Sequence, residues 1–189
     1  MNPQLKELLR AERCVHILYS YKTDENYIRQ AVKFIQDGIK AKDYIVFIEN
    51  ERLYPRIYKE LEKIYTEEEL KYMHHVKNFD FYNSSGSYHP PAIVEYFNKT
   101  VKPYVTDNIA FRSWAHVEWA TMEDPLKLVE ELEQQIDNAV NQLAFPLICA
   151  YHMDRMPEYL SKILKETHPY LLSDDDFTGS EHYKSLSGE

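Results

Sequence analysis

Apolar runs of strand length alternate with helical patterns along most of the chain. The runs cover residues 14–19, 44–49, 109–114 and 145–151, and a weaker one covers residues 75–82. Strands that alternate with helices are joined by crossover connections, so they lie parallel and have helices on both faces. The pattern predicts an α/β fold with three layers and a mainly parallel sheet of about five strands.

The helix after the first strand is the best marked of the predicted helices. Thr23 can cap its first turn, and its end is expected between Gly38 and Lys42. Its apolar face is formed by Tyr27, Ala31, Phe34, Ile35 and Ile39. Further helices are predicted at residues 51–64, after the capping box that begins at Thr66, after the prolines that follow His89, and at residues 125–143 and 156–167.

The length of 189 residues and the 44% hydrophobic content favour a single domain that spans residues 1–189. The segment from about residue 173 is polar, and we expect it to be loose at its end. Cys14 and Cys149 both lie in apolar, strand-like segments. They are therefore expected to be buried thiols rather than a disulfide.

The net charge of −9 argues against nucleic acid or an anionic membrane as a partner, because phosphate groups are bound by clustered Lys and Arg. The first residues, "MNPQLKELLRAER", are charged and amphipathic and do not read as a signal peptide. No stretch approaches about 18 consecutive apolar residues. A cytoplasmic location is expected.

The turn after the first strand, "SYKTDEN", contains no glycine. A phosphate-binding loop needs glycines so that successive backbone N–H groups can converge on a phosphate. Lys22 and Thr23 are present, but Asp24 and Glu25 would repel a triphosphate, and the whole chain has only 4 glycines. The sequence therefore predicts no ATP hydrolysis and no cofactor.

The segment "FIQDGIKAKDYIVFIENE" is similar to the corresponding unit of RecA/KaiC-type ATPases. The chain as a whole more closely resembles the MEDS (methanogen/methylotroph sensory) domain family, through "HILYSY", that segment, "FRSWAHVEW", "LEQQID", "LICAYHMDRM", "THP" and a late "HY". The resemblance implies a RecA-like core with a degenerate phosphate loop that senses a small molecule. Family proteins usually carry a further output domain, such as a DNA-binding or kinase module. No such domain is expected in this sequence, so the chain is expected to be a stand-alone sensory or regulatory module in bacterial signal transduction. The chain departs from the family pattern at Ala115-His116, where members often have Gly-Glu, and at His152, where they have an acidic residue.

Ligands of open parallel sheets bind outside the carboxyl ends of the strands. The candidates for a ligand site are therefore the residues at those ends. They are Tyr19, Tyr21, Glu49, Arg112, His116, Glu118, Trp119, Tyr151 and His152. Together they predict an aromatic pocket with a few polar anchors, although ordinary core packing also explains each aromatic residue.

Arg112 interrupts an otherwise apolar strand, and a buried guanidinium needs a carboxylate partner. Glu118, Glu49 or Glu133 is expected to provide it, either as a structural ion pair or at the ligand site.

Four histidines lie at or near the ends of predicted elements. They are His16, His116, His152 and His168. Imidazole is a common metal ligand, but no short spacing holds any two of the four together, so no metal site is predicted. His168 precedes Pro169 and is more simply a helix C-terminal cap.

The two tryptophans, Trp114 and Trp119, are expected on opposite faces of the fourth strand, with Trp119 in the pocket and Trp114 under a covering helix. A sensory module that binds a small organic ligand is the favoured function. The alternative is a protein-interaction regulator of a kinase or transcription factor with a vestigial pocket. An enzyme that uses Glu118, His116 or Cys149 has the least support, so no catalytic residue is assigned. The expected partners are a small organic ligand and a signalling protein, and a homodimer is left open.

Overall fold

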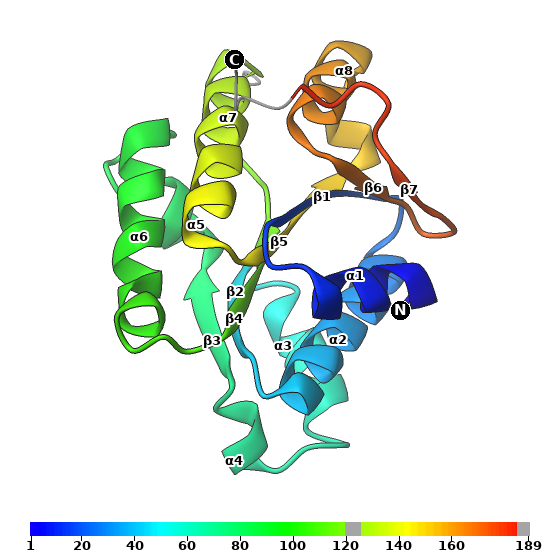
Figure 1. Ribbon diagram of the computed structural model, residues 1–189, viewed down its shortest axis with the longest axis vertical. Coiled ribbons are helices and arrows are strands. Elements are labelled where there is room, and N and C mark those ends of the chain that lie inside the picture. The colour runs from blue at the N-terminus through cyan, green and yellow to red at the C-terminus, as the bar shows by residue number, and fades with distance from the viewer. Residues whose placement is uncertain (120–125, 185–189) are drawn as a thin grey trace.

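The computed structural model describes residues 1–119 and 126–184 and has a seven-stranded sheet at its centre (Figure 1). The strands are β1 (Val15–Tyr21), β2 (Tyr44–Glu49), β3 (Met73–Lys77), β4 (Phe111–His116), β5 (Pro146–His152), β6 (Tyr170–Leu172) and β7 (Phe177–Gly179). Their order in the sheet is β3-β2-β4-β5-β1-β6-β7. All neighbouring strands are parallel except β6 and β7, which are antiparallel. The predicted mainly parallel α/β fold is confirmed, with two short strands in addition to the five expected.

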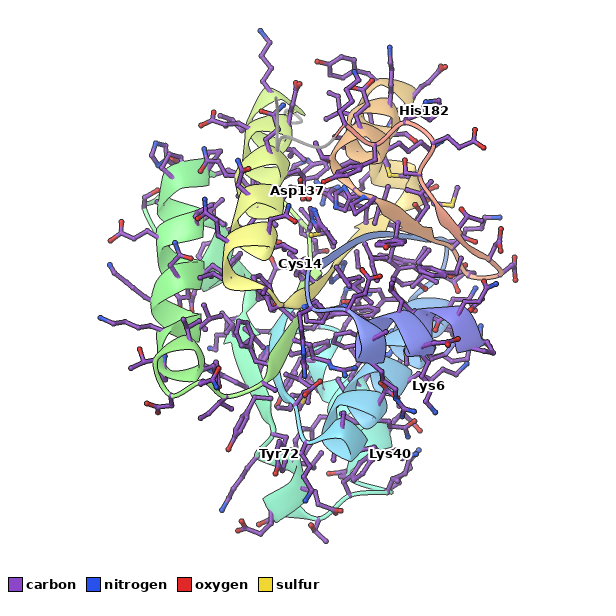
Figure 2. All side chains as sticks on the ribbon, viewed as in Figure 1. Lys6, Cys14, Lys40, Tyr72, Asp137 and His182 are labelled. Carbon is purple, nitrogen blue, oxygen red and sulfur yellow. The ribbon has the colours of Figure 1, made fainter. Side chains whose placement is uncertain are left out.

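The helices form a layer on each face of the sheet. On one face lie α1 (Pro3–Ala11), α2 (Asp24–Ala41), α3 (Tyr54–Leu61) and the short α4 (Glu67–Leu70), and on the other lie α5 (Asn78–Tyr82), α6 (Pro90–Thr106), α7 (Leu126–Leu143) and α8 (Glu158–Thr167). Side chains fill the space between each layer and the sheet (Figure 2) and form two separate apolar clusters. None of the helices in the described ranges is long and apolar enough to cross a membrane.

Local sequence signals account for most helix starts. The Thr23 side chain accepts a hydrogen bond from the Asn26 backbone N–H, and Thr66 and Glu69 form the predicted capping box. The helix predicted over residues 51–64 is shorter in the structure, where α3 covers Tyr54–Leu61. Pro125, where the sequence places the start of the long helix, lies outside the described residues.

The weak strand predicted over residues 75–82 is wrong in its second half. The strand β3 ends at Lys77, and α5 begins at Asn78. The buried residues of this segment are Asn78, Phe81 and Tyr82, which have the i, i+3, i+4 spacing of one helix face rather than strand alternation.

Two further expectations differ from the structure. Cys14 is exposed because it precedes the first residue of β1, whereas Cys149 is buried as expected, and both are free thiols. Part of the segment read as a polar tail forms β7, which pairs with β6 and buries Phe177. Residues 185–189, the expected loose end, lie outside the described part of the chain.

Candidate functional site

The connections that leave β1 and β5 run to opposite faces of the sheet. β1 leads into α2 on one face, and the neighbouring β5 leads toward α8 on the other. The same divergence separates β2, which leads to α3, from β4, which leads toward α7. Parallel sheets bind ligands at the carboxyl ends of such strands, so this edge is the candidate site.

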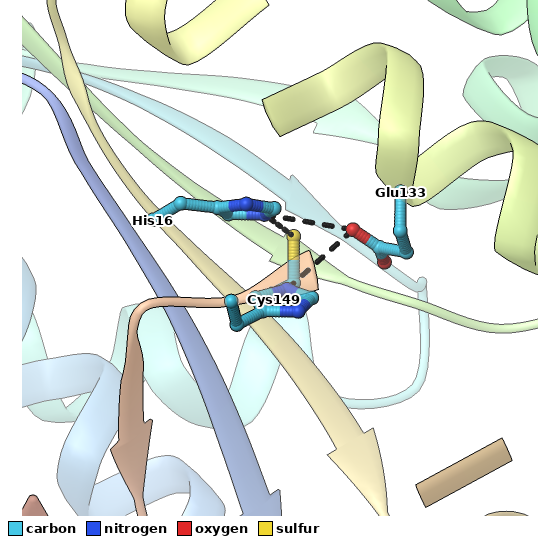
Figure 3. Close-up of side chains that lie close together, drawn as sticks. His16, Glu133 and Cys149 are labelled. Carbon is cyan, nitrogen blue, oxygen red and sulfur yellow. Dashed lines mark hydrogen bonds and ion pairs between the residues drawn. The ribbon is translucent and has the colours of Figure 1, made fainter. Parts of the chain in front are cut away.

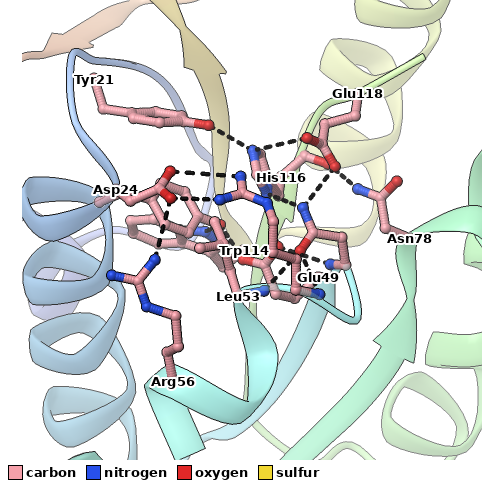
Figure 4. Close-up of polar contacts among 12 residues, drawn as sticks. Tyr21, Asp24, Glu49, Leu53, Arg56, Asn78, Trp114, His116 and Glu118 are labelled. Carbon is pink, nitrogen blue, oxygen red and sulfur yellow. Dashed lines mark hydrogen bonds and ion pairs between the residues drawn. The ribbon is translucent and has the colours of Figure 1, made fainter. Parts of the chain in front are cut away.

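A buried hydrogen-bond network crosses this edge and joins three strands (Figure 4). His116, the last residue of β4, places Nδ1 2.6 Å from Glu49 Oε1 at the end of β2 and Nε2 2.7 Å from the Tyr21 hydroxyl at the end of β1. A carboxylate only accepts hydrogen bonds, so His116 Nδ1 carries a proton. We call Tyr21, Glu49, Asn50, His116 and Glu118 the edge network.

The network continues inward beneath α2. The Tyr27 hydroxyl donates to the second carboxylate oxygen of Glu49, and Trp114 Nε1 donates to the Tyr27 oxygen over 2.8 Å. Trp114 also packs against Phe34 of α2, with ring centroids 5.3 Å apart. Its predicted position under a covering helix is therefore confirmed.

Asn50 carries the network outward. Its backbone N–H donates to Glu49 Oε1 over 2.7 Å, and its side-chain amide donates to Glu118 Oε2 over 2.8 Å. Glu118 Oε1 lies 3.8 Å from His116 Nε2, and the Asn78 amide donates to the His116 carbonyl oxygen. Glu118 is partly exposed, so the network begins at the surface and ends in the core.

A cavity of about 410 Å³ opens beside Glu118 and Asn50. It is lined by Asn50, Glu51, Lys77, Asn78, Phe79, Asp80, Asn83, Glu118, Trp119 and Arg155. The Arg155 guanidinium lies 4.7 Å from the centre of the Trp119 ring and donates to the Trp119 carbonyl oxygen. We call this space the edge cavity; its lining combines aromatic, amide and charged groups.

Charge and burial set the protonation of the edge network. Burial disfavours the charged form of His116, but the Glu49 carboxylate and then Glu118 outweigh it and raise the pKa of this imidazole. Burial, followed by the charges of Glu118 and Glu49, raises the pKa of the Tyr21 hydroxyl, and burial also raises the pKa of Tyr27. Both phenols are therefore neutral, and the raised pKa of His116 favours the imidazolium, whose Nε2–H donates to the Tyr21 oxygen.

The structure brings together four of the nine predicted site residues in the edge network, Tyr21, Glu49, His116 and Glu118. Trp119 lines the edge cavity, as predicted, and His152 packs edge-on against the Tyr21 ring with centroids 5.0 Å apart.

Two other predicted residues point elsewhere. The Tyr19 hydroxyl donates to Asp174 before β7, over 2.8 Å. The Tyr151 hydroxyl donates to Glu133 of α7 on the opposite face of the sheet. Successive strand residues face opposite sides, which explains why Tyr151 and His152 separate.

Arg112 lies near the amino end of β4, away from the edge cavity. It is fully buried and ion-paired, as expected, but its partners are Asp37 of α2 at 3.1 Å and Asp43 at 2.6 Å. The expectation that Glu118, Glu49 or Glu133 pairs with it is wrong, because Glu49 and Glu118 lie at the carboxyl edge of the sheet and Glu133 belongs to α7 on the opposite face from α2.

Two residues of the site, Tyr27 and Asn78, are not among the predicted site residues. The sequence pattern places Tyr27 on the apolar face of its helix, although the polar tip of a buried tyrosine usually needs a partner. It places Asn78 within a predicted strand, whereas Asn78 follows the carboxyl end of β3. The order of the elements would have pointed to Asn78 if the end of β3 had been placed correctly.

A second buried cluster lies between β1 and β5 and the helices α7 and α8. His16, Glu133 and Cys149 point toward one another in Figure 3. The rings of His16 and His168 are in contact, with centroids 3.9 Å apart. No short sequence spacing joins any two of the four histidines, but the fold brings this pair together. His168 also caps α8 as predicted, since its Nδ1 lies 2.7 Å from the Leu164 carbonyl oxygen.

The fold and the edge network define an α/β protein with a cavity at the carboxyl edge of a parallel sheet. Residues 15–169 match a family model described as MEDS, the MEthanogen/methylotroph, DcmR Sensory domain. This match covers most of the chain, which therefore belongs to the MEDS family of sensory domains. A search of curated proteins gave no match. The RecA-like character of the core stays a prediction.

Proposed function

We propose that this chain is a sensory module of bacterial signal transduction that binds a small organic ligand in the edge cavity and does not hydrolyse ATP. The observation that carries the proposal is the position of Asn50 and Glu118. Both line the edge cavity, and both are hydrogen-bonded into the edge network that reaches the core. A ligand that contacts either side chain therefore acts on buried groups without entering the core.

The size and lining of the edge cavity support a small ligand. Its volume of about 410 Å³ lies in the lower part of the range of about 300–1,000 Å³ that small-molecule sites occupy. Trp119 and Phe79 provide apolar contact area, while Asn50, Asn83 and Glu118 offer hydrogen-bond donors and acceptors. This combination favours a compact, weakly polar molecule with one hydrogen-bonding group.

The edge network supplies a route for the response. A ligand that takes the hydrogen bond of Asn50 to Glu118 can shift the Glu118 carboxylate relative to His116 Nε2, which contacts Tyr21 at the end of β1. A ligand shifts an equilibrium between two conformations only if it binds one of them more tightly. The hydrogen bond to Glu118 must therefore differ between the conformation that binds the ligand and the one that does not. The proposed output is a changed surface at this edge, recognised by a signalling protein.

The surroundings of Cys149 and of the turn between β1 and α2 favour ligand binding without a chemical reaction. Burial raises the pKa of the Cys149 thiol, which lies on the opposite side of the sheet from α2. At the start of α2, Asp24 is paired with Arg52 and Arg56, so a carboxylate occupies the place where a phosphate loop holds its anion. Neither feature suits a nucleophilic enzyme or an ATPase.

The test is a ligand screen with the full-length protein. Short alcohols, halocarbons, thiols and small carboxylates are added singly, and binding is read by native mass spectrometry and by the thermal midpoint. We expect at least one class to bind and to raise the midpoint, and Glu118→Gln to weaken that binding. The matched control is Glu62→Gln, since Glu62 is an exposed carboxylate at the end of α3 and does not line the edge cavity.

A flat response to all four classes would contradict the sensory proposal. It would favour the alternative, a regulator whose edge is a contact surface for a kinase or transcription factor.

A further inference from the structure

Four metal-ligating side chains meet in the buried cluster defined by His16, Glu133, Cys149 and His168. Their ligand atoms all lie within 4.8 Å of one another, and all four residues are buried. Glu133 Oε2 lies 3.5 Å from both His16 Nε2 and His168 Nε2, and Cys149 Sγ lies 3.4 Å from His16 Nε2. In a tetrahedral zinc site with bonds of about 2.0–2.3 Å, neighbouring ligand atoms are about 3.3–3.6 Å apart. These three separations fall within that range.

The hydrogen bonds around the cluster leave lone pairs facing one another. His168 Nδ1 bonds to the Leu164 carbonyl oxygen, which only accepts, so this nitrogen carries the proton and leaves Nε2 as the lone pair of the neutral ring. Nε2 faces Glu133 Oε2, another acceptor. Both atoms are buried and have no hydrogen-bond partner within residues 1–119 and 126–184. A positive group between these two buried acceptors would satisfy both of them.

We propose that this cluster is a closed binding site for a divalent transition metal, with Zn²⁺ as the best-matched ion. The ligands are His16 Nε2, His168 Nε2, Glu133 Oε2 and Cys149 Sγ. Two imidazoles, one thiolate and one carboxylate are a donor set that suits zinc, and four protein ligands are typical of structural zinc sites.

The surrounding groups orient each ligand for this role. His16 Nδ1 donates to Asp137 Oδ1 over 3.1 Å, which directs Nε2 toward the cluster, and the Leu164 carbonyl does the same for His168. The Tyr151 hydroxyl holds Glu133 Oε1, so the other oxygen is free to bind the ion. Such outer hydrogen bonds set the tautomer and position of metal ligands.

The site also balances its charge. When zinc binds, a zinc–sulfur bond forms, and the Cys149 thiol proton and any proton on His16 Nε2 leave to solvent. The charges of the dipositive ion and its four ligands, the thiolate and the Glu133 carboxylate included, then sum to zero, which suits a buried position. The ion cross-links β1, β5, α7 and the end of α8, so its role is structural.

The test measures metal binding by the full-length protein, first freed of metal with a chelator and then supplied with Zn²⁺ or Co²⁺. After gel filtration we expect one zinc ion per chain by elemental analysis and a higher thermal midpoint than the metal-free protein. The cobalt-loaded protein should show a thiolate-to-cobalt charge-transfer band. Asp137→Asn, which changes a positioning residue rather than a ligand, should weaken zinc binding by about 10–100-fold.

The two cysteines provide a matched pair of variants. Cys149→Ser should lose the charge-transfer band, and Cys14→Ser, which changes an exposed thiol, should keep both the band and the bound zinc. If Cys149→Ser does not fold, the bound zinc and the charge-transfer band of the wild-type protein and of Cys14→Ser still test the proposal. The proposal is overturned if the wild-type protein retains neither ion, or if Cys14→Ser abolishes the band.

Discussion

Arg112 and Asp43 form a buried ion pair in which Nη2 lies 2.6 Å from Oδ2, at the end of the sheet away from the edge cavity. Arg112 Nε donates to the same oxygen, and Nη1 donates to Asp37 Oδ2 over 3.1 Å. Since Asp37 belongs to α2 and Asp43 immediately precedes β2, one guanidinium ties the α2–β2 connection to β4.

Arg112→Ala is expected to destabilise the protein by about 3–5 kcal/mol, because it removes the buried cation between two buried carboxylates, which keep the half-exposed Arg10 and Arg13 as partners. The measurement is the free energy of unfolding from urea denaturation. Arg10→Ala is the control, since Arg10 also pairs with Asp37 but is half exposed, and its loss should cost about 1 kcal/mol or less. Equal effects of the two substitutions would contradict this account.

His116 is expected to make stability depend on pH. Glu49 raises the pKa of His116 in the folded state despite burial, while the unfolded value is about 6.5. The stabilisation is therefore complete below about pH 6.5 and is lost as the pH rises through the higher folded-state pKa. The difference in unfolding free energy between the wild-type protein and His116→Asn should shrink as the pH rises above about 6.5. A difference that stays constant or grows above that pH would contradict a raised folded-state pKa.

Trp119 is expected to report ligand binding by fluorescence. It lines the edge cavity beside Arg155, so an occupant changes the surroundings of its indole. In Trp114→Phe, a compound that raises the thermal midpoint should also change the emission of Trp119. The reciprocal variant Trp119→Phe should respond less, because Trp114 is fully buried under α2. The edge cavity would be the wrong site if only Trp114 responded.

ATP is not expected to bind with micromolar affinity or to be hydrolysed. The turn between β1 and α2 has no glycine, and Asp24 and Glu25 lie in the first turn of α2. Isothermal titration calorimetry at physiological ATP concentration, with and without Mg²⁺, should show no saturable heat. Saturable binding would require a phosphate site that this turn does not provide.

The sequence predicted the five main strands because buried parallel strands have continuous apolar runs. It did not reveal β6 and β7, each three residues long, since so short a segment has no readable period. The sequence predicts a strand at α5 for a related reason. Five residues are too few to separate helical from strand spacing when aromatic residues dominate them.

The sequence predicted the location of the candidate site, because the order of the elements determines which strand ends meet at one edge of the sheet. Tyr21, His116 and Glu118 meet because the carboxyl ends of β1 and β4 lie at the same edge. The direction of each side chain was not predictable, as Tyr151 and Tyr19 show. The contact of His16 with His168 joins the start of β1 to the end of α8, and only the order of strands in the finished sheet reveals it.

The two outermost strands, β3 and β7, bear on how the protein behaves at high concentration. An unpaired strand edge is a template for joining another chain, and natural proteins blunt it with short strands and charged side chains. β7 has only three residues, and β3 has the exposed Lys77 and His74 along its five. Neither edge offers a long apolar ribbon, so growth of fibrils by strand addition is disfavoured at both sides of the sheet.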